Sequence, residues 1–393
     1  MFKRTKRPKS AHSYVHHNDV KLIEGGRAYF DLLDEMIRTA KHSIHFQVYI
    51  FDEDETGQRV ARALKEAAFR GVKVYLLVDG YASRDLSKEF IHDMKVAGVN
   101  VRMFEPLLKS KKFYFGRRLH HKVIVVDVFH CLVGGLNISD RYNDMAEAKA
   151  WLDWALFAEG EIGEVLARIC TRRYKARIPI TAERTNPTPI KMTDIQKNCS
   201  VRERINDWVD RKREISKSYL EMFRTAKSHV TIMSPYFLPG NEFRREMKQA
   251  IRRGVTIKVI QAGTSDIAAS KYAERHMYRW LLRNKVQIYE YQKTVLHGKI
   301  AVTDHQWMTV GSYNINNLSA YISIELNLDV DNPHFAREVD RCLDSIIKMD
   351  CRQITEETYR TGTSWVEHQL QTLAYTLSRL VLFLFTFYVR QKE

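Results

Sequence analysis

The residues best suited to chemistry occur twice in this chain, as a histidine followed at fixed spacing by four other residues. Lysine, aspartate, glycine and asparagine lie 2, 7, 14 and 17 positions after each histidine. The two sets are His120, Lys122, Asp127, Gly134 and Asn137, and His297, Lys299, Asp304, Gly311 and Asn314. At about one in twenty per position, five fixed identities match by chance with a probability on the order of one in a million. The repeat therefore indicates a functional motif rather than two histidines in a core.

These residue types suit displacement at a phosphodiester. Imidazole is a nucleophile towards phosphorus and also exchanges a proton near neutral pH. A lysine two positions along a strand points to the same face as the histidine, where its charge meets a phosphate oxygen. Displacement needs a nucleophile on one side of phosphorus and a proton donor to the leaving oxygen on the other. We therefore expect His120 and His297 to meet in one site, with the lysines and asparagines carrying the charge that develops.

The elements that must position the motifs also repeat. Each half has a strand, a helix closed by Arg-Gly, a buried apolar strand, a second helix and a third strand before its motif. The predicted strands are 42–51, 72–80 and 97–105 in the first half, and 228–238, 255–263 and 286–291 in the second. The glycines Gly71 and Gly254, which end the helices, are 183 positions apart, and the motif histidines are 177 apart. Two units with one plan predict a duplicated α/β domain.

Composition shifts along the chain predict where the domains end. The proline-rich stretch 177–191 holds three of the eight prolines and no clear periodicity, which is typical of a linker. The predicted segments are a basic arm at 1–18, a first domain at 19–177, a linker at 178–200, a second domain at 201–355 and a hydrophobic tail at 356–393.

The charge and the cysteines restrict the setting. The chain of 393 residues carries 63 Lys and Arg against 47 Asp and Glu, a formal net charge of +16. Such a surface attracts nucleic acid or anionic lipid, although it also serves solubility alone. The five cysteines form no C-x-x-C pair, which argues against a zinc site and favours a reducing, cytosolic environment. No apolar stretch follows the basic N-terminus, so it is not a secretory signal.

Two segments bear on the choice between lipid and nucleic acid. Residues 109–122 interleave basic and aromatic side chains up to the first motif histidine, a pattern that suits a lipid interface, nucleic acid or a solvated loop. At the C-terminus, 14 of the 20 residues in 370–389 are apolar or aromatic. Arg379 in their middle argues against a simple membrane span. We predict a membrane-embedded or interfacial helix, and the alternative is a helix packed against the domain or a partner subunit.

The doubled motif with its G-G/S-x-N tails resembles the phospholipase D superfamily over most of residues 20–350. Within it, the stretch 76–107 and the compact length resemble bacterial cardiolipin synthases. The resemblance implies two duplicated α/β/α sandwich domains with mixed sheets around a pseudo-two-fold axis, followed here by the hydrophobic helix. It also implies catalysis through a covalent phosphohistidine, with no metal and no cofactor. By this resemblance His120 is the nucleophile and His297 the acid and then the base, and the reverse assignment stays open.

The resemblance also assigns roles to other residues. It predicts that Asp127 and Asp304 belong with the catalytic set. A carboxylate downstream of the motif holds the imidazole in this family, and Glu325 fits that place in the second copy. The first copy departs, because the same offset holds Ala148 and the nearest carboxylate is Asp153. The predicted phosphate-binding residues besides the lysines are Asn137, Asn314, Ser312 and Gly135.

These observations predict a membrane-associated phosphatidyltransferase that forms cardiolipin from phosphatidylglycerol. The expected partners are anionic phospholipids (phosphatidylglycerol and cardiolipin) and the membrane, with a homo-oligomer left open and no nucleic acid expected. The expected location is the cytoplasmic side of a bacterial inner membrane. The alternatives are a phospholipase D-type hydrolase and a nucleic-acid phosphodiesterase, while intact paired motifs disfavour a binding module with inactive sites.

Overall fold

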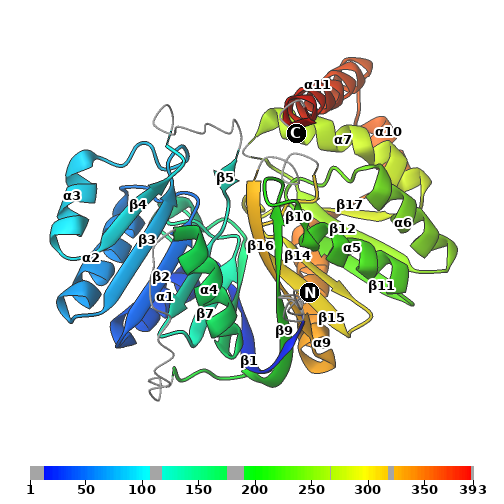
Figure 1. Cartoon of the computed structure of the whole chain (residues 1–393). Coiled ribbons are helices and arrows are strands. Elements are labelled where there is room, and N and C mark those ends of the chain that lie inside the picture. Colours follow the sequence, from blue (N-terminus) through cyan, green and yellow to red (C-terminus); the bar gives the residue numbers. More distant parts are fainter. Residues whose placement is uncertain (1–12, 107–116, 175–189, 266, 317–322, 391–393) are drawn as a thin grey trace, which may run out of the picture.

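A computed structural model describes residues 13–106, 117–174, 190–265, 267–316 and 323–390, arranged as two α/β halves side by side (Figure 1). The strands of the first half are β1 (Val15–Glu24), β2 (Ser43–Val48), β3 (Lys73–Asp79), β4 (Asn100–Phe104), β5 (Arg118–Leu119), β6 (Val123–Val126), β7 (His130–Gly134) and β8 (Trp154–Gly160). Its helices are α1 (Arg27–Thr39), α2 (Glu55–Phe69), α3 (Lys88–Val96), the short η1 (Asp140–Tyr142) and α4 (Ile162–Tyr174).

The second half repeats this plan. Its strands are β9 (Gln196–Asp207), β10 (Lys212–Arg213), β11 (His229–Met233), β12 (Thr256–Ala262), β13 (Gln287–Tyr291), β14 (Ile300–Thr303), β15 (Trp307–Gly311), β16 (Ser323–Asp331) and β17 (Cys351–Ile354). Its helices are α5 (Glu214–Thr225), α6 (Asn241–Arg252), α7 (Ala268–Arg283), α9 (Pro333–Asp350), α10 (Glu356–Thr361) and α11 (Trp365–Arg390). All six strands predicted before the motifs are confirmed, each within a few residues of its expected bounds.

A single mixed sheet passes through both halves, because β1 and β9 pair antiparallel at the junction. Outward from the junction the order is β1, β8, β7, β6, β2, β3 and β4 on one side. It is β9, β16, β15, β14, β11, β12 and β13 on the other, with β17 added at that edge. The same order on both sides confirms the duplicated fold that the sequence predicted.

Helices cover both faces of each half. In the first half α1, α2 and α3 bury their apolar faces against β2 and β3, and in the second half α5, α6 and α7 do so against β11 and β12. The opposite faces carry α4 and α9, whose apolar residues share one core with strands of both halves. Buried apolar surface therefore joins the two halves into one body, since removal of such surface from water favours association. Gly71 and Gly254 both have φ of 91°, as expected of glycines that end helices.

The predicted segment bounds change at the junction. Strand β1 begins at Val15, inside the predicted basic arm, and β9 begins at Gln196, inside the predicted linker. Both bounds were wrong because these strands carry many polar side chains, and their pairing across the junction becomes visible only in the folded chain. The basic arm before residue 13, most of the basic aromatic segment 109–122 and most of the linker lie outside the described residues.

The C-terminal helix α11 packs beside α7, where the rings of Tyr375 and His276 stack with centroids 4.5 Å apart. The segment is helical, and a run of its apolar side chains is exposed to solvent. This run, here called the apolar row, consists of Val366, Leu370, Leu373, Leu377 and Leu380. Among the described residues, no helix is both long enough and apolar enough to cross a membrane, so a spanning tail is not supported.

Candidate active site

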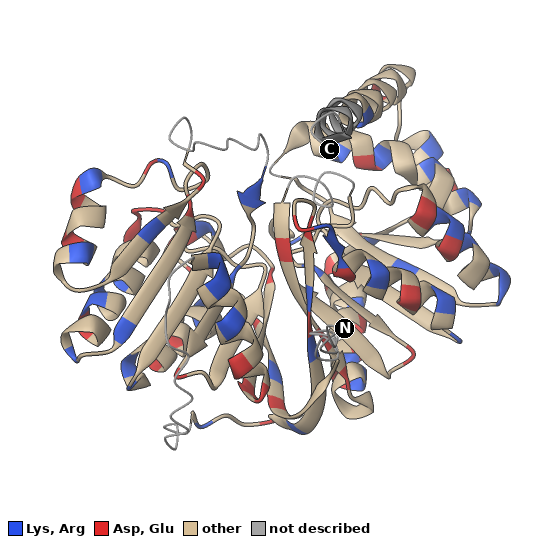
Figure 2. Ribbon diagram, viewed as in Figure 1, with Lys and Arg blue, Asp and Glu red and all other residues tan. Residues whose placement is uncertain are grey.

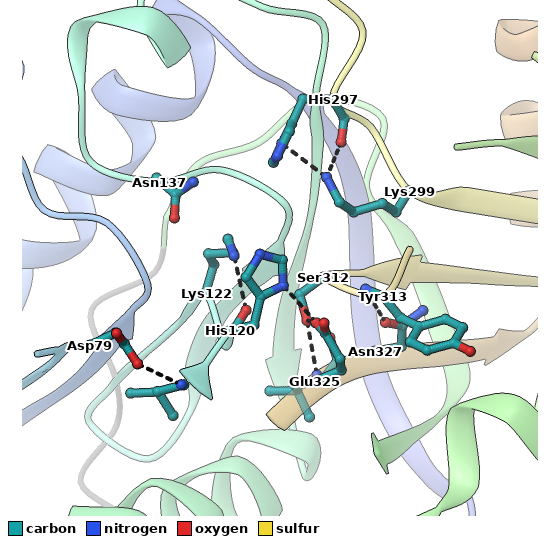
Figure 3. A network of polar contacts seen from close by, with 12 residues as sticks. Asp79, His120, Lys122, Asn137, His297, Lys299, Ser312, Tyr313, Glu325 and Asn327 are labelled. Atoms are coloured by element: carbon teal, nitrogen blue, oxygen red, sulfur yellow. Dashed lines mark hydrogen bonds and ion pairs between the residues drawn. The ribbon is translucent and has the colours of Figure 1, made fainter. Parts of the chain in front are cut away.

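The first motif histidine is held by both halves of the molecule. His120 follows β5, which pairs with β16 of the second half, and the His120 amide donates to the Ile324 carbonyl at 3.0 Å. From the first half, the Asp79 carboxylate accepts the Leu119 amide at 2.8 Å (Figure 3). The imidazole Nδ1 then lies 2.8 Å from Oε2 of Glu325, a fully buried residue of β16. The backbone pairing therefore delivers a carboxylate of the second half to the histidine of the first.

The second motif histidine shows the reverse arrangement. Nδ1 of His297 lies 2.6 Å from Oδ2 of Asp153, which is fully buried in the first half. The amides of His297 and Gly298 both donate to the Leu152 carbonyl, at 2.8 and 2.9 Å. Each imidazole is thus oriented by a buried carboxylate from the other half.

Strand pairing shows that Asp153 and Glu325 occupy equivalent places. The motif glycine Gly134 pairs with Ala155, and Gly311 pairs with Asn327. The two carboxylates each lie two residues before those partners. Ala148 is therefore not the equivalent position, and Asp153 is the carboxylate of the first copy. Counting from the histidine failed because the segment before β8 is five residues longer than its counterpart, and counting back from the strand identifies Asp153.

The two lysines are buried beside the histidines. Lys122 donates to the His120 carbonyl at 3.0 Å, and its Nζ lies 5.0 Å from the centre of the Tyr49 ring. Lys299 donates to the His297 carbonyl, and its Nζ is 3.0 Å from His297 Nδ1. Burial lowers the pKa of Lys122 well below its ordinary value, and the charge of Lys299 lowers it further. The charged groups of the two motifs therefore influence each other. Figure 3 shows the side chains of both motifs in one view.

Two tyrosines pack against the imidazoles, and the sequence did not single out either. The edge of Tyr49 meets His120 with ring centroids 4.7 Å apart, and Tyr142 meets His297 at 5.2 Å. Asn137, predicted to bind phosphate, donates to the Tyr142 hydroxyl at 2.8 Å and accepts the Ile50 amide at 3.1 Å. Its amide is therefore engaged in holding Tyr142 against His297. Asn314 is buried, and within the described part of the chain its Oδ1 has no hydrogen-bond partner.

Burial sets the protonation of the site. It lowers the pKa of His120, against the opposing effect of Glu325, so this imidazole is neutral near pH 7. Because an ionised carboxylate only accepts hydrogen bonds, Nδ1–H of His120 donates to Glu325, and the lone pair of the neutral imidazole lies on Nε2. Burial also raises the pKa of Asp153 to about 6. The charges of Lys299 and Lys122 oppose this effect.

The motif aspartates lie at the opposite ends of their strands from the histidines. Asp127 accepts the amides of residues 41–43 at 2.7–2.9 Å, and Asp304 accepts those of residues 227–229 at 2.8–3.0 Å. Both have positive φ, at the turn that closes the β6–β7 or β14–β15 hairpin. Their predicted catalytic role is not supported by this placement, because their carboxylates are occupied in joining the hairpin to the neighbouring strand.

Gly135 and Ser312 contact the carboxylates rather than an open phosphate site. The Ser312 hydroxyl donates to Oε2 of Glu325. At the equivalent place in the first half, a Cβ on Gly135 would lie 2.3 Å from Oδ1 of Asp153. The Ser312 hydroxyl therefore helps to hold the Glu325 carboxylate. The absence of a side chain at Gly135 leaves room for the Asp153 carboxylate. Their predicted phosphate-binding role stays a prediction, and the contacts present are with the two carboxylates.

Comparison with known proteins places this site in a family. Residues 33–153 and 219–347 match a family model described as "Cardiolipin synthase, PLD-like domain". Cardiolipin synthase B of Escherichia coli K12 is 32% identical over 364 residues, which cover 90% of this chain and 86% of that protein. Cardiolipin synthase of Halalkalibacterium halodurans is 30% identical over 79% of this chain and 62% of that protein.

A solved structure shows the same fold at low identity. The crystal structure of phosphatidylserine synthase from Haemophilus influenzae Rd KW20 matches with a TM-score of 0.71, over 94% of this chain and 95% of that chain. Only 13% of the residues are identical, so this likeness concerns the fold alone. The family match and the bacterial relatives together show that the chain belongs to the cardiolipin synthase family of phospholipase D-like proteins.

Proposed function

We propose that this protein is a membrane-associated phosphatidyltransferase that forms cardiolipin from phosphatidylglycerol through a covalent phosphohistidine. The observation that carries the proposal is the crossed pair of contacts, Glu325 to His120 and Asp153 to His297. Two imidazoles whose Nδ1 atoms are both occupied present their Nε2 atoms to a substrate. One nucleophile and one proton carrier are what a two-step transfer at phosphorus requires.

In the first step, Nε2 of His120 forms a bond to phosphorus while the bond from phosphorus to the headgroup oxygen breaks. His297 gives its proton to that oxygen, and glycerol leaves. In the second step, His297 takes the proton of a hydroxyl on a second phosphatidylglycerol, whose oxygen bonds to phosphorus as the N–P bond breaks. Lys122 and Lys299 stabilise the phosphate charge in both transition states, with Asn314 as a further donor.

The surface supports a lipid interface. The apolar row of α11 is exposed, although exposed leucines are costly in water. Figures 1 and 2 show α11 beside α7, which carries several Lys and Arg residues, at the end of the molecule where β5 leads to His120. An apolar row beside positive charge suits the surface of an anionic membrane. We place the protein on the cytoplasmic side of a bacterial inner membrane, held at the interface rather than by a span.

The central test is incubation of the purified protein with phosphatidylglycerol vesicles. We expect cardiolipin and free glycerol in equal amounts, with turnover that persists in EDTA because the transition-state charge is met by lysines. Phosphatidic acid as the main lipid product would instead show a hydrolase. DNA cleavage without any lipid product would overturn the proposal.

Trapping the intermediate tests the assignment of the two histidines. A phosphatidyl donor with p-nitrophenol as leaving group needs no proton on departure, so His297→Ala should still become covalently labelled. His120→Ala should not be labelled, and His92→Ala, at an exposed site on α3, serves as the control with full turnover. Labelling of His120→Ala but not His297→Ala would reverse the roles.

A further inference from the structure

A second cluster of titratable side chains lies away from the active site. It consists of His229 at the start of β11, His305 in the β14–β15 turn and Asp340 on α9. Oδ2 of Asp340 lies 2.5 Å from His229 Nε2 and 2.8 Å from His305 Nδ1. Three elements that are distant in the sequence thus direct two imidazole nitrogens to one carboxylate oxygen.

Neighbouring hydroxyl groups orient two of these side chains. The Ser228 hydroxyl donates to the Asp304 carboxylate at 2.8 Å, so it accepts the Nδ1 proton of His229 at 3.0 Å. This arrangement leaves Nε2 of His229 facing Asp340. The Thr231 hydroxyl is directed to the other carboxylate oxygen, Oδ1, at 3.3 Å. Such outer contacts are typical of metal ligands, because they fix which atom of each ligand points to the ion.

A lone pair on His229 Nε2 and a carboxylate oxygen repel each other at 2.5 Å unless a cation lies between them. A proton meets this need by making the imidazolium, and a metal ion meets it by binding both atoms. We propose that His229, His305 and Asp340 bind one divalent transition-metal ion, with Zn²⁺ as the best match. Two imidazoles and one carboxylate are a common zinc ligand set.

The geometry needs only a small adjustment. Tetrahedral zinc with ligand bonds of about 2.0–2.2 Å keeps its ligand atoms about 3.4 Å apart. The three candidate ligand atoms all lie within 4.8 Å of one another. The two contacts with Oδ2 of Asp340, at 2.5 and 2.8 Å, must lengthen by under ~1 Å to reach the zinc spacing. His305 sits in a turn with 49% of its side chain exposed, so it has room to move, and water can reach a fourth position.

The cluster belongs to the second half and not to the catalytic centre. In the first half, the positions equivalent to His229 and His305 are Ser43 and Val128, because Asp127 and Asp304 make matching contacts. The five steps from Lys299 to Asp304 extend about 16 Å at ~3.3 Å per residue, which separates the cluster from the catalytic lysine. A bound ion would therefore fasten α9 to the sheet.

The electrostatics agree with this geometry. A hydrogen bond to Asp340 raises the pKa of His229, and despite burial the pKa of Asp340 is lowered by His229 and His305. Both shifts have the direction expected of a contact between imidazole and carboxylate. Lys258, whose charge lowers the pKa of His229, is itself paired with Asp344 at 2.7 Å. No metal was predicted from the sequence, where the members of this cluster lie 76 and 35 positions apart and share no local motif.

Zinc titration of the full chain without an affinity tag tests the proposal. Calorimetry should show one equivalent of Zn²⁺ bound with micromolar or tighter affinity, and Zn²⁺ should raise the melting temperature by several degrees. The double variant His229→Gln/His305→Gln should lose this equivalent and the melting shift. His334→Gln, an exposed histidine on the same helix α9, should keep both.

A spectroscopic measurement guards against a variant that folds poorly. Co²⁺ added to the native protein should give the visible absorption of a tetrahedral complex, and Zn²⁺ should displace it. Equal zinc binding by native protein and the double variant would overturn the proposal, as would no binding at all by the native protein. Lipid turnover at a temperature well below melting should not change with EDTA, which separates this site from the proposed chemistry.

Discussion

Glu325 Oε2 lies 2.8 Å from Nδ1 of His120, so the carboxylate that orients the first motif histidine belongs to the second half of the chain. Asp153 of the first half serves His297 in the same way at 2.6 Å. Neither half alone pairs its motif histidine with the carboxylate that orients it. This crossing explains why the molecule needs both copies of its motif, even though each copy has a complete set of motif residues.

Removing the charge of Glu325 should affect both rate and pH dependence. We expect Glu325→Gln to lower turnover by about 100-fold, because an orienting partner of an active histidine is lost. Burial lowers the pKa of His120 and Glu325 opposes this, so the imidazole gains its second proton only at a pH below its ordinary pKa. Without the carboxylate the pKa falls further, and the acid limb of kcat/KM should move to lower pH. An acid limb that moves to higher pH would contradict this role.

The position of Gly135 should not tolerate a side chain. A Cβ there would come within 2.3 Å of Asp153 Oδ1, so Gly135→Ser should displace the carboxylate from His297 and reduce turnover by about 100-fold. Ser312→Gly, the converse change, removes only one hydrogen bond to Glu325 and should cost about tenfold. Steady-state turnover of lipid vesicles by both variants measures the difference, and equal losses would refute it.

The motif aspartates should matter for stability rather than for the chemical step. Asp127→Ala and Asp304→Ala each remove several backbone hydrogen bonds to a carboxylate, and each should reduce the free energy of unfolding by about 2 kcal/mol. Urea unfolding followed by circular dichroism measures this loss. Turnover per folded molecule should stay within a few-fold of native, and a loss as large as that of His120→Ala would restore the catalytic assignment.

Lowering the pH should weaken the hydrogen bonds that Asp304 accepts from residues 227–229 in the native protein. Hydrogen bonds from residues 227–229 lower the pKa of Asp304 below its ordinary value of 3.8. A depressed carboxyl pKa contributes stability that is present above the unfolded value and is lost as pH falls through the folded value. The difference in unfolding free energy between native protein and Asp304→Ala should therefore be constant above about pH 5 and shrink below pH 4. A difference that grows on acidification would show the opposite sign.

The apolar row of α11 should determine membrane binding. We expect Leu373→Glu/Leu377→Glu to reduce sedimentation with phosphatidylglycerol vesicles at least tenfold, because two charges replace exposed apolar contacts. Thr376→Glu adds a charge on the same helix outside the row and should bind almost as native protein does. Hydrolysis of a soluble phosphodiester should be unchanged in both. Unaltered vesicle binding by the double variant would assign the row to another contact.

Much of the fold followed from local pattern. The buried strand at 73–79 is a continuous apolar run, and Gly71 and Gly254 mark the helix ends that precede it and its copy. The first five residues of the junction strand β9 fell within the predicted linker instead, because the alternation of charged and apolar residues in β9 makes sense only beside β1 and β16. The contacts of Asp127 and Gly135 likewise could not be predicted, since both depend on partners that are far away in the sequence.

The sequence by itself determined the duplication and predicted the chemistry, because spacing within a strand fixes which side chains share a face. It identified His120, Lys122, His297 and Lys299, and it identified Glu325 as a carboxylate for an imidazole. Only the tertiary structure decided which carboxylate serves which histidine. Hydrogen-bond partners across a domain junction are selected by the packing of β5 on β16, which no local pattern records. The crossed pairing is therefore a property of the assembled sheet, and it makes one active site from two motifs.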